Sequence, residues 1–99
     1  MFLVREIMHC KPGKARPMVE KMQKLAKLTH EMGLGGMRIL TDVSGERYWT
    51  VISEIEVPNL ETFTEQTRKS GQDPRFREVM HDYHDLVDHG RREIYMIEK

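Results

Sequence analysis

The stretch that decides the fold is residues 15–32, ARPMVEKMQKLAKLTHEM. Its larger apolar side chains recur at spacings of three and four residues, at Met18, Met22, Leu25 and Leu28. This spacing places them on one face of a helix, and that face must pack against another layer of the protein. Pro17 fits the first helical turn, where a missing backbone N–H loses no partner, and the glycines after Met32 end the helix.

Strands are predicted on both sides of this helix. Residues 2–9 are rich in apolar side chains and stop at the turn signal CKPG of residues 10–13. Residues 37–41 and 47–57 are predicted to be the second and third strands, joined by a hairpin-type connection that contains DVSG at 42–45.

Two helix-start signals follow the third strand. Asn59 is placed as an N-cap and predicts a short helix over residues 60–69. Asp73 precedes a proline and predicts a second helix, whose apolar residues keep helical spacing and which we expect to end at Gly90. Residues 92–97 then supply the fourth strand.

The predicted order is strand, helix, strand, strand, helical segments, strand. This is the split βαβ arrangement of ferredoxin-like α+β domains. Right-handed crossovers favour a four-stranded antiparallel sheet with both helical segments on one face. Ninety-nine residues are too few for two hydrophobic cores, so we expect a single domain over residues 1–99.

The predicted strands are apolar on both faces. In the first strand Val4 and Met8 have one parity, whereas Leu3 and Ile7 have the other. Helices on one side leave the second face as a large apolar surface in a monomer. We therefore predict a homodimer that joins two copies through this sheet face. The alternative is a thinly packed monomer with an apolar back face.

The amino-acid composition limits the kinds of partner that the protein can bind. Sixteen basic and sixteen acidic residues cancel, which removes the positive field that binding to nucleic acid or to an anionic membrane requires. One cysteine can form neither an intramolecular disulfide nor a cysteine-based zinc site, and no apolar leader segment opens the chain. We expect a soluble cytoplasmic protein that binds neither nucleic acid nor a membrane.

Five short segments stand out: VREI at 4–7, KPGK at 11–14, SEIE at 53–56, LETF at 60–63 and DPRF at 73–76. Together they resemble the dimeric α+β barrel superfamily, and within it the NIPSNAP-like and antibiotic-biosynthesis-monooxygenase-like proteins. The resemblance implies a homodimer with a pocket in each protomer between helices and sheet. Its members include cofactor-independent oxygenases and haem-degrading enzymes. The haem-degrading pattern is missing here, because the first strand has no asparagine and Gln66 stands near the expected tryptophan, so we predict no cofactor.

The segment HDYHDLVDH at 81–89 carries the candidate catalytic residues, His81 and His84. An imidazole beside an aspartate could act as a general base on a phenol or an enol before oxygen attack. With Asp85 the two histidines have a spacing that permits a metal, but no complete ligand motif is present, and we predict no metal site. The alternative is an exposed polar helix face.

The predicted ligand-binding residues are Arg5, Trp49, Phe76, Met80 and Tyr83. An arginine inside a strand needs an anionic ligand or a carboxylate partner, and an acidic strand residue is the alternative partner for Arg5. The aromatic residues could instead belong to the core or to an interface.

These expectations lead to a small homodimer that binds a small apolar or aromatic metabolite, with cofactor-independent monooxygenase chemistry as the reaction the resemblance implies. The alternative is a non-catalytic dimeric ligand-binding or assembly module. The pocket discriminates between them. A histidine facing a closed cavity favours the enzyme, whereas a wall of methionine and phenylalanine side chains favours the module.

Overall fold

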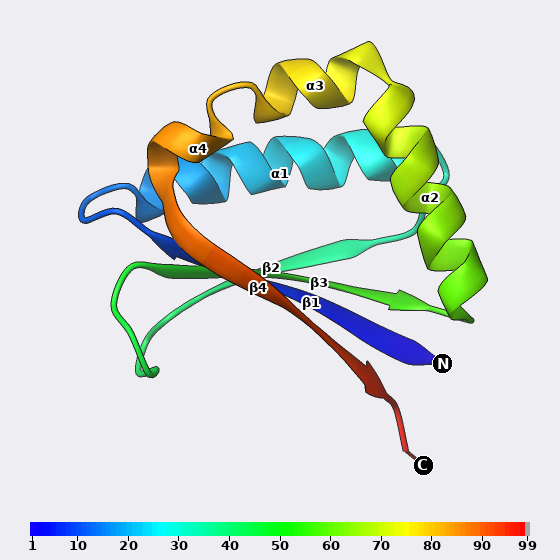
Figure 1. Cartoon of the computed structure of the whole chain (residues 1–99), viewed down its shortest axis with the longest axis horizontal. Helices are drawn as coiled ribbons and strands as arrows, with labels where there is room; N and C mark the ends of the chain where they lie inside the picture. The colour runs from blue at the N-terminus through cyan, green and yellow to red at the C-terminus, as the bar shows by residue number, and fades with distance from the viewer. Residues whose placement is uncertain (99) are drawn as a thin grey trace.

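The computed structural model describes residues 1–98. Its elements are, in chain order, β1 (Phe2–Cys10), α1 (Ala15–Glu31), β2 (Met37–Thr41), β3 (Thr50–Val57), α2 (Leu60–Gln72), α3 (Pro74–Met80), α4 (Tyr83–Leu86) and β4 (Val87–Met96). The strands form one antiparallel sheet in the order β2-β3-β1-β4. Figure 1 shows all the helices on one side of the sheet. The predicted α+β, ferredoxin-like fold is confirmed.

The strand register assigns a face to each side chain. Val4 lies opposite Ile55 of β3 and Ile94 of β4, on the side that faces the helices. Arg5 and Ile7, one residue out of phase, lie on the opposite side, which we call the open face. No helix covers the open face among the described elements (Figure 1).

Helix α1 forms the main cover of the sheet, as its sequence predicts. The four apolar positions of its stripe are buried, and Met18 is 0% exposed. Met18, Met22 and Leu25 pack with Met8 and Val51 of the central strands and with Leu86 at the end of α4. The N-cap role predicted for Asn59 is also confirmed, since its side chain accepts a hydrogen bond from the backbone N–H of Thr62 at 2.7 Å.

The single helix predicted from Asp73 to Gly90 is wrong. The chain leaves the helix after Met80, turns, forms the one-turn α4 and enters β4 at Val87. Lys21 of α1 explains the break, because its ammonium donates to the backbone carbonyl of Val79 at 2.5 Å and pairs with the Asp82 carboxylate. That contact satisfies a carbonyl at the helix end from outside the helix.

Gly90 has a different role from the helix end predicted for it. It lies inside β4 opposite Met8, where a Cβ atom would stand 2.7 Å from the backbone carbonyl oxygen of Ile7. A side chain at this position would require β1 and β4 to move apart. The glycine is therefore explained by close strand contact.

The third strand starts three residues later than predicted, at Thr50. The backbone N–H of Thr50 donates to the Asp42 carboxylate at 2.9 Å, and its hydroxyl donates to the Arg47 carbonyl at 2.8 Å. These bonds close a turn that leaves Trp49 with a φ of 60°, outside the strand. Within residues 1–98, no helix has the length and apolar character needed to cross a bilayer.

Candidate ligand-binding cavity

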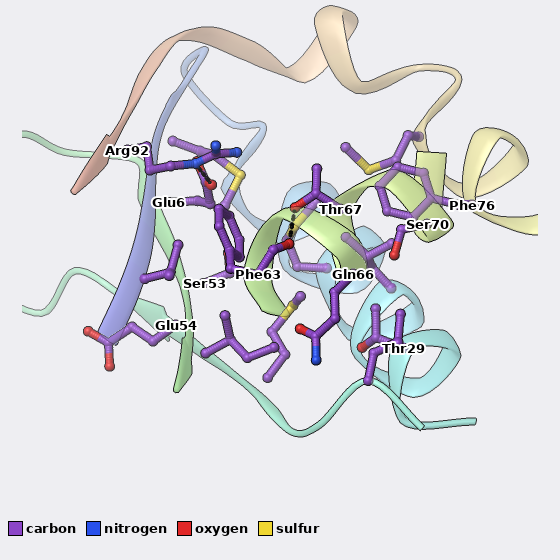
Figure 2. Close-up of a pocket in the computed structure, with 18 of the residues that line it drawn as sticks. Glu6, Thr29, Ser53, Glu54, Phe63, Gln66, Thr67, Ser70, Phe76 and Arg92 are labelled. Carbon is purple, nitrogen blue, oxygen red and sulfur yellow. Dashed lines mark hydrogen bonds and ion pairs between the residues drawn. The ribbon is translucent and has the colours of Figure 1, made fainter. Parts of the chain in front are cut away.

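A cavity of about 290 Å³ lies between the helix-facing side of the sheet and the helices (Figure 2). Its apolar wall consists of Val4, Met8, Met22, Leu25, Leu34, Met37, Ile55, Phe63, Phe76, Met80 and Tyr83. Its polar groups come from Glu6, Thr29, Ser53, Glu54, Gln66, Thr67, Ser70 and Arg92. The volume is near the lower end of the ~300–1,000 Å³ typical of small-molecule sites.

Helix α2 explains why this space is not filled by the core. It turns toward the cavity the residues Phe63, Gln66, Thr67 and Ser70, whose spacing of three and four residues is that of one helix face. Only Phe63 among them is apolar. The wall that α2 contributes is therefore largely polar, in contrast to the apolar stripe of α1.

Two buried hydroxyls at the cavity wall have no hydrogen-bond partner among residues 1–98. Ser53 is 6% exposed and Ser70 is 7% exposed. Fully buried side-chain nitrogen and oxygen atoms of the described residues all have partners, so these two hydroxyls must reach accessible space. Since both residues line the cavity, that space is the cavity itself. Such groups are available to a bound molecule.

A charged pair lies at one side of the cavity. Glu6 and Arg92 are directly opposite in the β1–β4 register, and the Arg92 Nε donates to the Glu6 carboxylate. The guanidinium also lies over the Phe63 ring, 5.0 Å from its centre. Figure 2 shows this pair on one side of the view, with Thr29 and Ser70 on the other.

The remaining ionisable groups of the wall differ from this pair. Burial raises the pKa of Tyr83, and the nearby Glu6 carboxylate raises it further, so the phenol is neutral at physiological pH. Glu54 contributes to the wall, but its carboxylate accepts hydrogen bonds from Arg5 and Arg38 on the open face. In Figure 2 that carboxylate points away from the other labelled residues.

Sequence comparison finds no match among protein-family models or among curated proteins. Solved structures do match. A NIPSNAP family protein from Agrobacterium tumefaciens superposes with a TM-score of 0.84 at 17% identity, covering 100% of this chain and 95% of the other. A NIPSNAP domain protein from Burkholderia xenovorans gives 0.83 at 14% identity, covering 99% and 95%. A candidate antibiotic biosynthesis monooxygenase from Nitrosomonas europaea gives 0.74 at 13% identity, with 100% of both chains covered.

The chain has the NIPSNAP and antibiotic biosynthesis monooxygenase fold. At these identities the likeness extends to the fold alone. The resemblance inferred from the sequence is confirmed at that level.

Within this NIPSNAP-type fold, three of the predicted ligand-binding residues lie together. Phe76, Met80 and Tyr83 all belong to the cavity wall, as expected from the inward stripe of their helical segment. The other two lie elsewhere. Arg5 is on the open face, where its Nε donates to the Glu54 carboxylate at 2.7 Å, and Trp49 belongs to the turn before β3, beside a separate surface hollow.

The two predicted catalytic histidines do not line the cavity. The His81 side chain is 75% exposed and its Nδ1 lies 3.0 Å from the backbone carbonyl of Glu78. The exposed His84 packs edge to face against the Tyr83 ring. Their catalytic role stays a prediction. In the part of the chain that the structure describes, no three His, Cys, Asp or Glu side chains gather closely enough to hold a metal ion.

The polar half of the cavity was not predicted from the sequence. The signal was the face 63, 66, 67 and 70 of α2, which is three-quarters polar although it lies on a helix that must cover a sheet. A second signal was Glu6, a charged residue on the same strand parity as Val4 and Met8. Arg92 could not be found, because its position opposite Glu6 depends on the register of β4.

Proposed function

We propose that this protein binds a small, mostly apolar or aromatic metabolite in the cavity, as a ligand-binding module. The observation that supports this proposal is a wall rich in methionine and phenylalanine, into which two buried hydroxyls without protein partners open. Apolar walls with a few polar groups are typical of small-molecule sites. Among the described lining residues there is no histidine, which favours the binding module over histidine-based catalysis.

The volume of the cavity limits the ligand to roughly one or two rings. Naphthalene is therefore a suitable probe, followed by amide chemical shifts in ¹H–¹⁵N spectra. We expect shifts at Phe63, Ser70, Met80 and their neighbours, and saturation with increasing probe.

A pair of variants on α2 tests whether naphthalene binds in the cavity. Ser70→Leu places a large side chain in the cavity and should weaken naphthalene binding by about tenfold or more, because the ligand loses the space it occupies. Thr64→Leu adds similar bulk on the exposed side of the same helix and should leave binding unchanged. Unchanged binding in a folded Ser70→Leu variant, or shifts confined to residues outside the cavity wall, would contradict the proposal.

Cofactor-independent monooxygenase chemistry is a second candidate, favoured by the fold shared with the antibiotic biosynthesis monooxygenases. Proton removal from a bound phenol would require a base at the wall, and Glu6 is the carboxylate that faces the helix side. Oxidation of a naphthol by O₂ would give a quinone and water. Oxygen uptake with 1-naphthol that is lost in Glu6→Gln would support this candidate, and no uptake above a protein-free control would exclude it for that probe.

We also propose that the protein is a cytoplasmic homodimer joined through the open face. Ile52 lies there between Ile7 and Leu40, and Leu40 and Tyr95 are 37% and 47% exposed. Several charges of this face are paired within the chain, for example Arg5 with Glu54, so a second copy could cover these groups while each keeps its partner. The free, buried Cys10 suits a reducing compartment.

A further inference from the structure

We infer that the cavity selects an uncharged ligand whose polar head group both donates and accepts hydrogen bonds, and that Glu6 and Arg92 bind this head group. A carboxamide, or a hydroxyl beside a carbonyl, is such a group. The inference rests on the proposed function, since it names the ligand class of the same site. The charge balance of the cavity wall supports this ligand class. Glu6 and Arg92 are the only charged side chains of the described wall whose charged ends lie on the helix side, and their charges cancel.

The pair leaves both kinds of hydrogen-bonding group free. The ion pair uses the Nε of Arg92 and one oxygen of Glu6. Among residues 1–98, the two terminal nitrogens of the guanidinium and the second Glu6 oxygen have no other hydrogen bond. The Arg92 and Glu6 side chains are 49% and 36% exposed and both residues line the cavity, so a molecule bound there can reach them. A head group with one donor and one acceptor could satisfy both.

A carboxylate suits this arrangement poorly. Its oxygens could accept from Arg92, but they would lie beside the Glu6 carboxylate, and like charges at hydrogen-bond distance repel strongly when partly desolvated. The rest of the wall supplies no compensating cation among the described residues. Apart from Glu54, whose carboxylate lies on the open face, the other polar groups are neutral: the hydroxyls of Thr29, Ser53, Thr67 and Ser70, the Gln66 amide and the Tyr83 phenol, whose raised pKa keeps its proton.

Phe63 fixes where the head group must lie. Its ring stacks under the Arg92 guanidinium at 5.0 Å and at the same time forms part of the apolar wall. A ring that contacts Phe63 in the cavity, with its substituent directed toward Arg92, would place that substituent beside the Glu6–Arg92 pair. Thr29 and Ser70 lie on the other side in Figure 2, away from the pair.

Two isosteric probes test the inference, 2-naphthamide and 2-naphthoate, with naphthalene as the probe without a head group. By titration at neutral pH, wild-type protein should bind 2-naphthamide at least about tenfold more tightly than 2-naphthoate, the difference expected for one charge-assisted hydrogen bond. Glu6→Gln removes the negative charge, retains the shape, and should abolish or reverse this preference. Glu65→Gln removes a carboxylate that pairs with Arg68 on the exposed side of α2, and it should retain the wild-type preference.

Equal binding of the two probes to wild-type protein, or tighter binding of 2-naphthoate, would overturn the inference even if Glu6→Gln failed to fold. Naphthalene separates this failure from failure of the proposed function. If naphthalene binds in the cavity without any preference between the head groups, the ligand class is wrong and the binding site stands. If none of the three probes binds there, both proposals fail.

Discussion

Replacing Glu54 by glutamine should destabilise the protein at neutral pH, and the effect should shrink in acid. The side chain is only 4% exposed, and its carboxylate accepts a hydrogen bond from Arg5 Nε at 2.7 Å and another from Arg38. Glutamine preserves the shape but replaces charge-assisted hydrogen bonds by neutral ones. This network matters to the site, because it holds Glu54, the second carboxylate of the described cavity wall, on the open face.

The size of the effect follows from the less exposed of the two partners. A hydrogen bond to a charged group contributes about 1.5–3 kcal/mol and a neutral one about 0.5–1.5 kcal/mol, so the Arg5 contact should lose about 1–2 kcal/mol. For a chain of this length that lowers the melting temperature by about 4–16 °C. Arg38, whose side chain is 67% exposed, changes the result in the same direction by an amount that solvent reduces.

The destabilisation caused by Glu54→Gln should depend on pH. The Arg38 hydrogen bond is the main cause of a lowered pKa for Glu54, with Arg5 adding to it against the effect of burial. A carboxyl whose pKa is lower in the folded state contributes stability above its unfolded value of 4.5, and this contribution is lost as the pH falls through the folded value. The melting difference between wild type and Glu54→Gln should therefore be largest near neutral pH and shrink as the pH falls below 4.5.

Thermal melts at matched protein concentration measure this difference. Glu65→Gln is the control, since Glu65 pairs with Arg68 on an exposed helix face, and its melting temperature should stay close to that of wild type. A Glu54→Gln variant as stable as wild type at neutral pH, or a difference that does not shrink in acid, would refute the assignment of Glu54 to this network.

Three further outcomes follow from the structure. Because both side chains are exposed and outside the cavity wall, His81→Ala and His84→Ala should each change stability by no more than about 0.5 kcal/mol and leave naphthalene binding unchanged, whereas weakened binding would support the predicted catalytic role. Ile52→Lys places a charge on the open face and should convert a sedimenting dimer into monomers, and a stable wild-type monomer at micromolar concentration would argue against the dimer. Chelator treatment should leave the melting temperature unchanged, while a marked fall would reveal a bound metal.

The parts of the fold that local sequence determines could be predicted. The helix over 15–32 has an apolar stripe of regular spacing, and Asn59 caps the next helix through its own side chain. The end of α3 at Met80 could not be predicted, because Lys21 of another helix binds the Val79 carbonyl there. Gly90 was misassigned for a similar reason, since its requirement comes from the Ile7 carbonyl of the neighbouring strand.

The candidate site was half predictable. Phe76, Met80 and Tyr83 follow from the periodicity of one segment, and the cavity wall includes all three. The pairing of Glu6 with Arg92 depends on the register between β1 and β4, and the two residues are 86 positions apart in the sequence. His81 and His84 were predicted to be catalytic from their residue type, but the helix ends at Met80 and both side chains are exposed.

A crystal structure of the protein grown with 2-naphthamide would show directly whether the cavity binds a ligand and where its head group lies. We expect the ring to lie against Phe63, Phe76 and Met80 inside the cavity, with the carboxamide between Glu6 and Arg92. A cavity closed by its own side chains, or a probe bound only in the hollow beside Trp49, would contradict this expectation.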